Sequence, residues 1–148
     1  MNVPVYTFEA ITIAEGMVKP IVGAGSQYMS AAKDKNGAWL DGGKNYSLRV
    51  PPNVPAKDFW AVTVYDNMTR SMIQIDANKA GVSPQDKLQV NSDGSIDVYF
   101  GPTAPAGKES NWIKTVPGKD WFAYFRWYGP TEAFFDKSWK LEDIVAAK

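Results

Sequence analysis

The chain has 148 residues, with sixteen Lys and Arg against sixteen Asp and Glu, and it contains no Cys and no His. A chain of this length normally forms one domain, so we expect residues 1–148 to fold around a single core. The absence of Cys excludes disulfides, and the absence of His excludes a Ser-His-Asp triad and histidine-ligated zinc. The balanced charge argues against nucleic-acid binding. We expect no metal and no organic cofactor.

Residues 1–22 fit two kinds of structure. Thr7 can cap a helix that runs to Met17, with Pro20 after its end. We favour this helix, although residues 10–13 would suit a strand equally well. The segment lacks the basic and apolar regions of a signal peptide, and no apolar run is long enough to span a bilayer. If Met1 is the native start, the chain would be cytoplasmic; otherwise the compartment stays open.

From Ser26 onward the pattern predicts short strands separated by turns. Tyr46, Leu48 and Val50 alternate with polar residues, which is typical of a half-buried strand. The segment 59–66 is apolar on both faces except for Thr63 and the closing Asp66, which favours a central strand. The expected strands in this half are residues 26–33, 38–41, 44–50, 59–66 and 71–76.

Two further strand signals follow. Residues 87–90 and 95–100 predict a β-hairpin with Asp93-Gly94 in the turn. Residues 121–128 predict a long aromatic strand that is broken by Gly129-Pro130.

The C-terminal region predicts one short helix and a docked tail. Thr131 can cap a helix over residues 131–136, and Trp139, Leu141 and Ile144 are expected to hold the tail on the core. Many short strands with closely spaced turns predict an all-β fold, namely a jelly-roll-like antiparallel β-sandwich with one or two short helices.

Three long motifs carry a resemblance to a known family. They are FWAVTVYDNMTRSM (59–72), VYFGPTAPAGKESNWIKTVPGKDWF (98–122) and YGPTEAFFDKSW (128–139). The chain resembles, from about Gly25 to Ile144, the bacterial domain-of-unknown-function family twelve-fourteen, which normally follows a family twelve-fifty-four domain. The resemblance implies a jelly-roll-like sandwich, usually in exported or envelope proteins, with no established activity.

Two departures from the family pattern matter. The companion domain is missing from this sequence, so the surface that it would cover is expected to be exposed, lost or covered by self-association or a partner domain. The segment 73–78 differs from the family's pattern, which puts any site built around residues 74–78 in doubt.

A first candidate site lies around the turn after the central strand. Asp66 can accept backbone N–H groups of its own turn, and Arg70 can pair with its carboxylate. Alternatively, Arg70 could bind the carboxylate or phosphate of a ligand. We favour the structural interpretation.

A second candidate is the polar loop that contains Lys108, Glu109, Asn111 and Trp112. A Glu beside an exposed Trp could hold a sugar on a rigid scaffold. The alternative is a loop anchored by Trp112 against the sandwich. As a hydrolase, the chain would use Glu109 as general acid with a second carboxylate about 5–10 Å away; the candidates are Asp66, Asp76 and Asp120.

A third candidate is the aromatic strand around Arg126. If Phe125 and Trp127 point inward, Arg126 shares the outer face with Tyr124 and Tyr128. Such a ladder could stack planar or sugar ligands, or it could be cross-strand packing alone, which is the interpretation that we favour. The remaining expectations are that Lys119 is a solvated turn residue and that the core or edge tryptophans are Trp39, Trp60, Trp121 and Trp139.

These features favour a non-catalytic ligand-binding or accessory module for a carbohydrate or another small polar ligand. The predicted binding residues are Arg70, Glu109, Asn111, Trp112, Arg126 and Tyr128. The alternatives are a structural domain that mediates homo-oligomerisation or docks a partner domain, and a carboxylate-dependent hydrolase.

Overall fold

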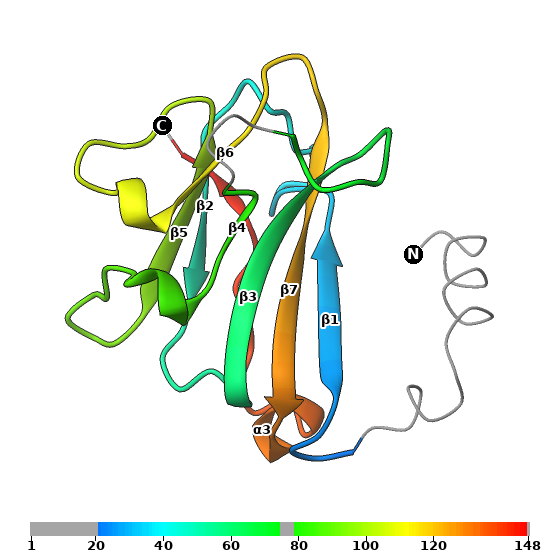
Figure 1. Ribbon diagram of the computed structural model, residues 1–148, viewed down its shortest axis with the longest axis vertical. Coiled ribbons are helices and arrows are strands. Elements are labelled where there is room, and N and C mark those ends of the chain that lie inside the picture. The colour runs from blue at the N-terminus through cyan, green and yellow to red at the C-terminus, as the bar shows by residue number, and fades with distance from the viewer. Residues whose placement is uncertain (1–20, 75–78, 148) are drawn as a thin grey trace.

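The computed structural model describes residues 21–74 and 79–147, and two four-stranded sheets form most of it (Figure 1). Sheet I contains, in spatial order, β1 (Ser26–Ala31), β7 (Trp121–Pro130), β3 (Ala56–Asp66) and β4 (Gly81–Val82). Sheet II contains β6 (Trp112–Lys114), β5 (Ile96–Gly101), β2 (Tyr46–Val50) and β8 (Val145–Ala146). Neighbouring strands are antiparallel except β5 and β6. The predicted all-β sandwich is confirmed.

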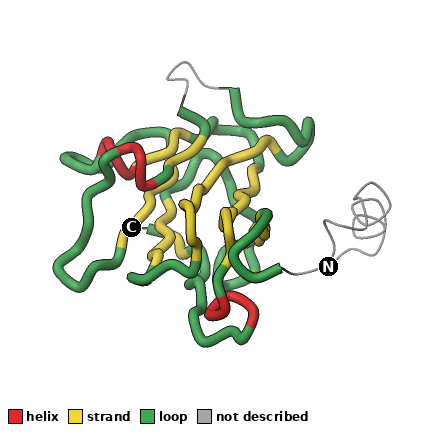
Figure 2. Tube along the Cα trace, turned by 60° about the horizontal axis from the view of Figure 1, so that its bottom comes forward, coloured by secondary structure: helices red, strands yellow, loops and turns green. Residues whose placement is uncertain are grey.

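Among the described residues, three helical turns connect these strands: η1 (Pro84–Asp86), η2 (Glu109–Asn111) and α3 (Glu132–Phe135). Figure 2 shows how short these turns are beside the strands. Within the ranges that the structure describes, no helix is long and apolar enough to cross a membrane. The helix predicted from Thr7 to Met17 lies outside those ranges.

β7 is one of the two inner strands of sheet I, because it pairs with β1 on one side and with β3 on the other. Its alternating side chains divide as expected, with Phe125 and Trp127 buried in the core. The strand does not stop at Gly129. Gly129 has φ 63, which glycine adopts without steric strain, so β7 continues to Pro130 opposite a bulge in β3.

The core lies between the inward faces of the two sheets. Sheet II contributes the alternating residues predicted for β2, and sheet I contributes the inward side chains of β3 and β7. Aromatic contacts join the layers, since Phe100 of β5 stacks on Trp121 of β7 with 4.8 Å between ring centroids. The tail closes the core with Ile144, which is buried, while Trp139 and Leu141 pack partly against it as predicted.

The predicted hairpin between residues 87–90 and β5 is wrong. Its tight turn forms, since the Gly94 N–H donates to the Asn91 carbonyl at 2.9 Å. However, β5 pairs with β2 on one side and with β6 on the other. Both edges of β5 are therefore occupied, and residues 87–90 run as a loop.

Two other predicted strands shorten to isolated bridges. The segment 38–41 contacts its neighbours through the pairs Lys33–Trp39 and Asp41–Asp120. In the segment 71–76, Met72 bridges Tyr65, and residues 75 and 76 lie outside the described residues. Thr131 precedes α3 as predicted, but its side chain makes no capping hydrogen bond.

Candidate functional site

Arg126 lies on the outer face of sheet I, on the side away from the core. It belongs to β7, and its neighbours in register are Tyr28 on β1 and Ala61 on β3. Because side chains alternate along a strand, the same face also carries Tyr124 and Tyr128. Ala61 is small, so the larger neighbours of the half-buried Arg126 side chain on this face are tyrosines.

Three tyrosine rings frame the Arg126 guanidinium. Its carbon lies 5.6 Å from the ring centroid of Tyr28, 5.8 Å from that of Tyr65 and 5.9 Å from that of Tyr124. The guanidinium also donates a hydrogen bond to the Tyr65 hydroxyl. These distances are within the range of cation–π attraction. We call this surface the tyrosine–arginine face; its residues are Tyr28, Tyr65, Tyr124, Arg126 and Tyr128.

The tyrosine rings are themselves held in place by aromatic contacts. Tyr65 and Tyr124 meet edge to face at 5.4 Å, and Tyr28 and Tyr124 at 6.3 Å. Tyr128 stacks on Phe59 of β3 at 4.1 Å. Aromatic pairs of this geometry stabilise a structure by more than the burial of their surface alone. The face is therefore largely preformed, although Tyr28 remains 52% exposed.

Arg126 keeps its positive charge without a carboxylate partner. Burial lowers the pKa of Arg126, but a hydrogen bond with Tyr128 and Coulombic attraction to Tyr65, Tyr128 and Tyr28 outweigh burial and raise it. Its Nε is buried and has no hydrogen-bond partner among the described residues. No described Asp or Glu makes an ion pair with Arg126.

Arg49 on sheet II shows the contrasting arrangement. It belongs to β2, and it pairs with Asp93 at 2.6 Å and with Asp97 at 3.8 Å. These acidic neighbours neutralise its charge, whereas the tyrosine rings around Arg126 do not. Of these two arginines, only Arg126 has no acidic partner among the described residues.

Arg70 lies near one end of the tyrosine–arginine face. Its guanidinium carbon is 5.3 Å from the ring centroid of Phe122. Phe122 in turn stacks on Tyr65 at 5.3 Å and meets Tyr124 edge to face at 5.5 Å. A series of aromatic contacts thus runs from Arg70 toward the tyrosines around Arg126.

The predicted pair between Arg70 and Asp66 is wrong. Lys119, expected to be a solvated turn residue, donates to the Asp66 carboxylate at 3.1 Å instead. The turn gives Arg70 a φ of 59 and directs its guanidinium to Phe122. The predicted turn bonds do form, because Asp66 accepts the N–H groups of Met68 at 2.8 Å and Thr69 at 3.0 Å.

The other three predicted binding residues lie away from this face, around η2 and β6 beside β5 (Figure 1). Asn111 is buried, and its side chain bonds to backbone groups. Trp112 donates its indole N–H to the Gly101 carbonyl at 3.0 Å, and Glu109 accepts the N–H of Gly107 at 3.1 Å. These contacts hold the loop itself. The predicted binding residues therefore fall into two groups, with Arg70, Arg126 and Tyr128 on the sheet I side and Glu109, Asn111 and Trp112 around η2.

The carboxylates named for a hydrolase have the following positions. Asp66 is bound by its own turn and Lys119, which hold its pKa at about 2, far too low for a proton donor near neutral pH. Asp120 is exposed, and Asp76 lies outside the described residues. The described residues bring no three metal-ligating side chains into one cluster.

Three members of the tyrosine–arginine face are not among the predicted binding residues. Tyr124 was expected to share this face, whereas Tyr28 and Tyr65 were not expected there. Tyr28 comes from β1 and Tyr65 from β3, and each reaches Arg126 only because β7 lies between these strands. The sequence does contain one signal for them, because both are aromatic residues in segments that it predicts as strands. Their meeting at Arg126 requires knowledge of the strand order.

Comparison with known proteins places the chain among proteins without an assigned activity. A family model described as "Protein of unknown function (DUF1214)" matches residues 25–132. No curated protein matches the chain.

Two solved structures are similar to this chain. One is a protein from Vibrio parahaemolyticus, with 27% sequence identity and a TM-score of 0.71 over 83% of this chain and 31% of that one. The other is an uncharacterised protein from Burkholderia cenocepacia, with 20% identity and a TM-score of 0.59 over 83% of this chain and 30% of that one; this second likeness concerns the fold alone. The chain thus spans less than a third of the length of either protein.

Proposed function

This chain belongs to the DUF1214 family of proteins of unknown function, and since that family offers no activity, we propose a function from the chemistry of its surface. The domain is a non-catalytic binding module whose tyrosine–arginine face takes a carbohydrate or another small polar ligand. The preferred ligand is a sugar that carries a carboxylate.

One observation carries this proposal: Arg126 is a cation framed by three tyrosine rings, without a carboxylate partner among the described residues. A guanidinium presents paired N–H donors that match a carboxylate. The tyrosine rings supply apolar faces against which the C–H groups of a sugar can pack, and their hydroxyls can bond to sugar hydroxyls. The same group of side chains can therefore bind both the carboxylate and the ring of an acidic sugar.

The test compares ligands that differ only in charge. Trigalacturonate and its methyl ester share one sugar backbone, but only the former carries carboxylates. We expect binding of trigalacturonate, measured by calorimetry and by shifts of NMR signals from residues on sheet I, and weaker binding of the ester. Arg126→Gln should weaken trigalacturonate binding roughly ten- to hundredfold, since hydrogen bonds to charged groups contribute about 1.5–3 kcal/mol.

Matched controls come from sheet II. Arg49→Gln and Tyr99→Ala alter an arginine and a tyrosine that lie outside the tyrosine–arginine face, and they should leave binding unchanged. Arg126→Lys separates charge from geometry, because lysine keeps the charge but cannot form the paired contact. Equal binding of acid and ester, or equal loss in the sheet II variants, would contradict the proposal.

A second candidate function is assembly. The two similar solved chains are more than three times as long as the part that aligns with this chain. A further domain of such a protein could cover the tyrosine–arginine face, which favours this function. Sedimentation at high protein concentration tests self-association. If the chain forms a dimer that Arg126→Gln and Tyr28→Ala convert to a monomer, the face is an interface rather than a ligand site.

A further inference from the structure

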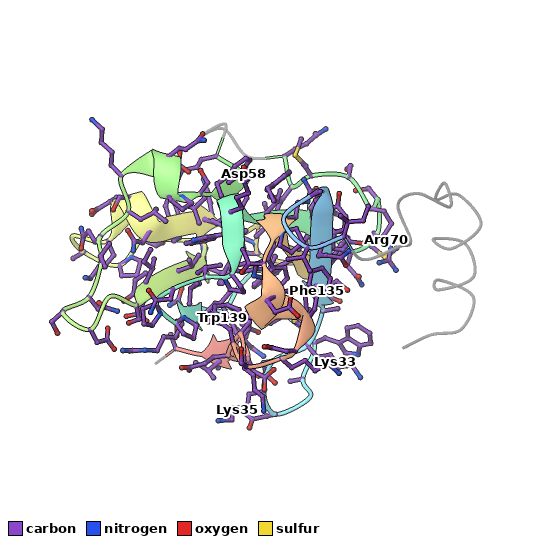
Figure 3. The ribbon with its side chains drawn as sticks, turned by 90° about the horizontal axis from the view of Figure 1, so that it is seen from below. Lys33, Lys35, Asp58, Arg70, Phe135 and Trp139 are labelled. Atoms are coloured by element: carbon purple, nitrogen blue, oxygen red, sulfur yellow. The ribbon has the colours of Figure 1, made fainter. Side chains whose placement is uncertain are left out.

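A second candidate ligand site is a cavity of about 540 Å³ that lies beside the end of β7 and the segment after α3. Small-molecule sites commonly have volumes of this order. Figure 3 labels two of its lining residues, Phe135 of α3 and Trp139, which follows it. The cavity opens on the side of the sandwich that carries β1 and is separate from the tyrosine–arginine face, since it shares no residue with it.

The walls of the cavity are mainly aromatic and apolar. Trp127 of β7 contacts Phe134 at 4.9 Å and Trp139 at 6.1 Å between ring centroids. Met29 of β1 and Leu141 of the tail complete the apolar lining. Such walls favour an apolar ligand body, because burial of its surface removes apolar area from water.

One wall residue has a hydrogen-bond donor that is not used. Trp127 is 1% exposed, and its indole N–H has no hydrogen-bond partner among the described residues. A buried donor without an acceptor is unfavourable. By contrast, Trp139 donates its indole N–H to the Pro52 carbonyl at 3.0 Å. Trp127 thus lines the cavity while its indole N–H is shielded from solvent.

Two lysines, Lys137 and Lys140, are the charged residues that line the cavity. Neither makes an ion pair with a described carboxylate. The nearby carboxylate of Asp136 accepts the N–H of Ser138 at 2.8 Å. The lysine charges therefore remain available to an anionic group.

Lys137 has an unusual backbone conformation, with φ 61 directly after the last turn of α3. Glycine is common at such a position because other residues are strained there. Strained residues of this kind cluster at functional sites. At this position the chain carries a cationic side chain on the cavity instead of the glycine that the backbone favours.

We propose that this cavity binds an amphipathic carboxylate, a molecule with an apolar body of moderate size and one carboxylate head. The apolar body lies against Trp127, Phe134 and Trp139. The carboxylate lies near Lys137 and Lys140. This site is independent of the tyrosine–arginine face.

The experiment titrates the full chain with three probes that share one alkyl chain: decanoate, decan-1-ol and decyltrimethylammonium. The readout is the set of indole N–H signals in two-dimensional NMR, with the Trp127 signal assigned by its absence in Trp127→Phe. We expect decanoate to bind most tightly, decanol more weakly and decyltrimethylammonium weakest. Decanoate should shift the Trp127 signal in particular.

Substitutions of the two lysines test whether the cavity recognises the carboxylate or only the apolar chain of the ligand. Lys137→Gly and Lys140→Gln should each weaken decanoate binding about two- to fivefold, the range of exposed charge pairs, while decanol binding stays unchanged. Lys137→Gly should also keep or raise the melting temperature, so that weaker binding cannot be attributed to unfolding. Arg126→Gln should leave decanoate binding unchanged.

Three outcomes would overturn the proposal. The first is that decanoate leaves the Trp127 indole signal unmoved. The second is that the cationic probe binds as well as the anionic one. The third is that decanoate affinity is the same in both lysine variants as in the unaltered chain. Because Arg126 is not involved, failure here leaves the binding function proposed for sheet I standing, and the reverse also holds.

Discussion

The side-chain amide of Asn111 pairs with the backbone of Gln89 as a second strand would. Its Oδ1 accepts the Gln89 N–H at 2.7 Å, and its Nδ2 donates to the Gln89 carbonyl at 2.9 Å. The same Nδ2 also donates to the Asp97 carbonyl on β5 at 3.0 Å. One buried side chain therefore links residues 87–90 to sheet II, in the region where the sequence predicted a hairpin.

Substitution of Asn111 should be costly for stability. Asn111→Asp keeps the size of the side chain and one acceptor, but it removes both donor bonds and places a charge at a site that is 2% exposed. We expect a loss of about 2–4 kcal/mol in the free energy of unfolding, measured in urea. Asn36→Asp, in an exposed turn, is the matched control and should change stability by less than about 0.5 kcal/mol. Equal losses in the two variants would contradict this account.

Asp66 should make stability depend on pH in acid. The backbone N–H of Thr69, the Lys119 ammonium and the N–H of Met68 hold the pKa of Asp66 at about 2, below its usual value near 4. Because the folded pKa is the lower one, this stabilisation is fully present above about pH 4 and is lost as pH falls toward about 2.

Chemical unfolding at a series of pH values measures this effect. Asp66→Asn should be less stable than the unaltered chain at neutral pH, and the difference should shrink between about pH 4 and pH 2. Asp120→Asn removes an exposed carboxylate of the same type and serves as control. A constant difference between Asp66→Asn and the unaltered chain across this range would show that the charge of Asp66 does not matter.

Gly42 and Gly43 are adjacent but should respond differently to alanine. A Cβ at Gly42 would lie 2.2 Å from the Val116 carbonyl oxygen, whereas the nearest atom to one at Gly43 would be a carboxylate oxygen of Asp41 at 3.3 Å. The first neighbour is backbone and cannot move away, so Gly42→Ala should cost about 1–3 kcal/mol or more. Gly43→Ala should lie within about 1 kcal/mol of the unaltered chain. Thermal unfolding of both variants decides the matter.

Lys137→Gly should stabilise the fold. Its φ of 61 is strained for any residue with a Cβ, and glycine removes that strain, although a more flexible unfolded chain offsets part of the gain. We expect an increase of up to about 1 kcal/mol in the free energy of unfolding. Lys140→Gly is the comparison, because Lys140 has no positive φ, and this variant should gain nothing. A loss in Lys137→Gly would mean that its side chain stabilises α3.

The local pattern predicted which side of a strand each residue occupies. The inward position of Phe125 and Trp127, and hence the outward position of Arg126 and its tyrosine neighbours on β7, follows from the two-residue repeat of a strand. The Asp66 turn followed from its residue types in the same way. These features depend on residues within a few positions of one another, so the sequence contains the information directly.

Strand pairing was not predictable in this way. The turn at Asp93-Gly94 formed, yet β5 paired with β2 and β6, because any exposed strand edge can accept a partner and packing of the whole core selects which one does. The pair between Lys119 and Asp66 joins residues 53 positions apart. Arg70, only four positions from Asp66, was the more obvious partner, but the turn geometry directs it to Phe122.

By itself, the sequence determined the β-sandwich class, the family and the exclusion of histidine and cysteine chemistry, because these depend on composition, periodicity and long motifs. Only the tertiary structure decided that Tyr28 and Tyr65 meet Arg126, that Glu109 and Trp112 lie elsewhere, and that Trp127 lines a cavity with two lysines. The physical reason is that alternation assigns a side chain to a face of its own strand, whereas the neighbours on that face come from other strands, whose order depends on the packing of the entire core.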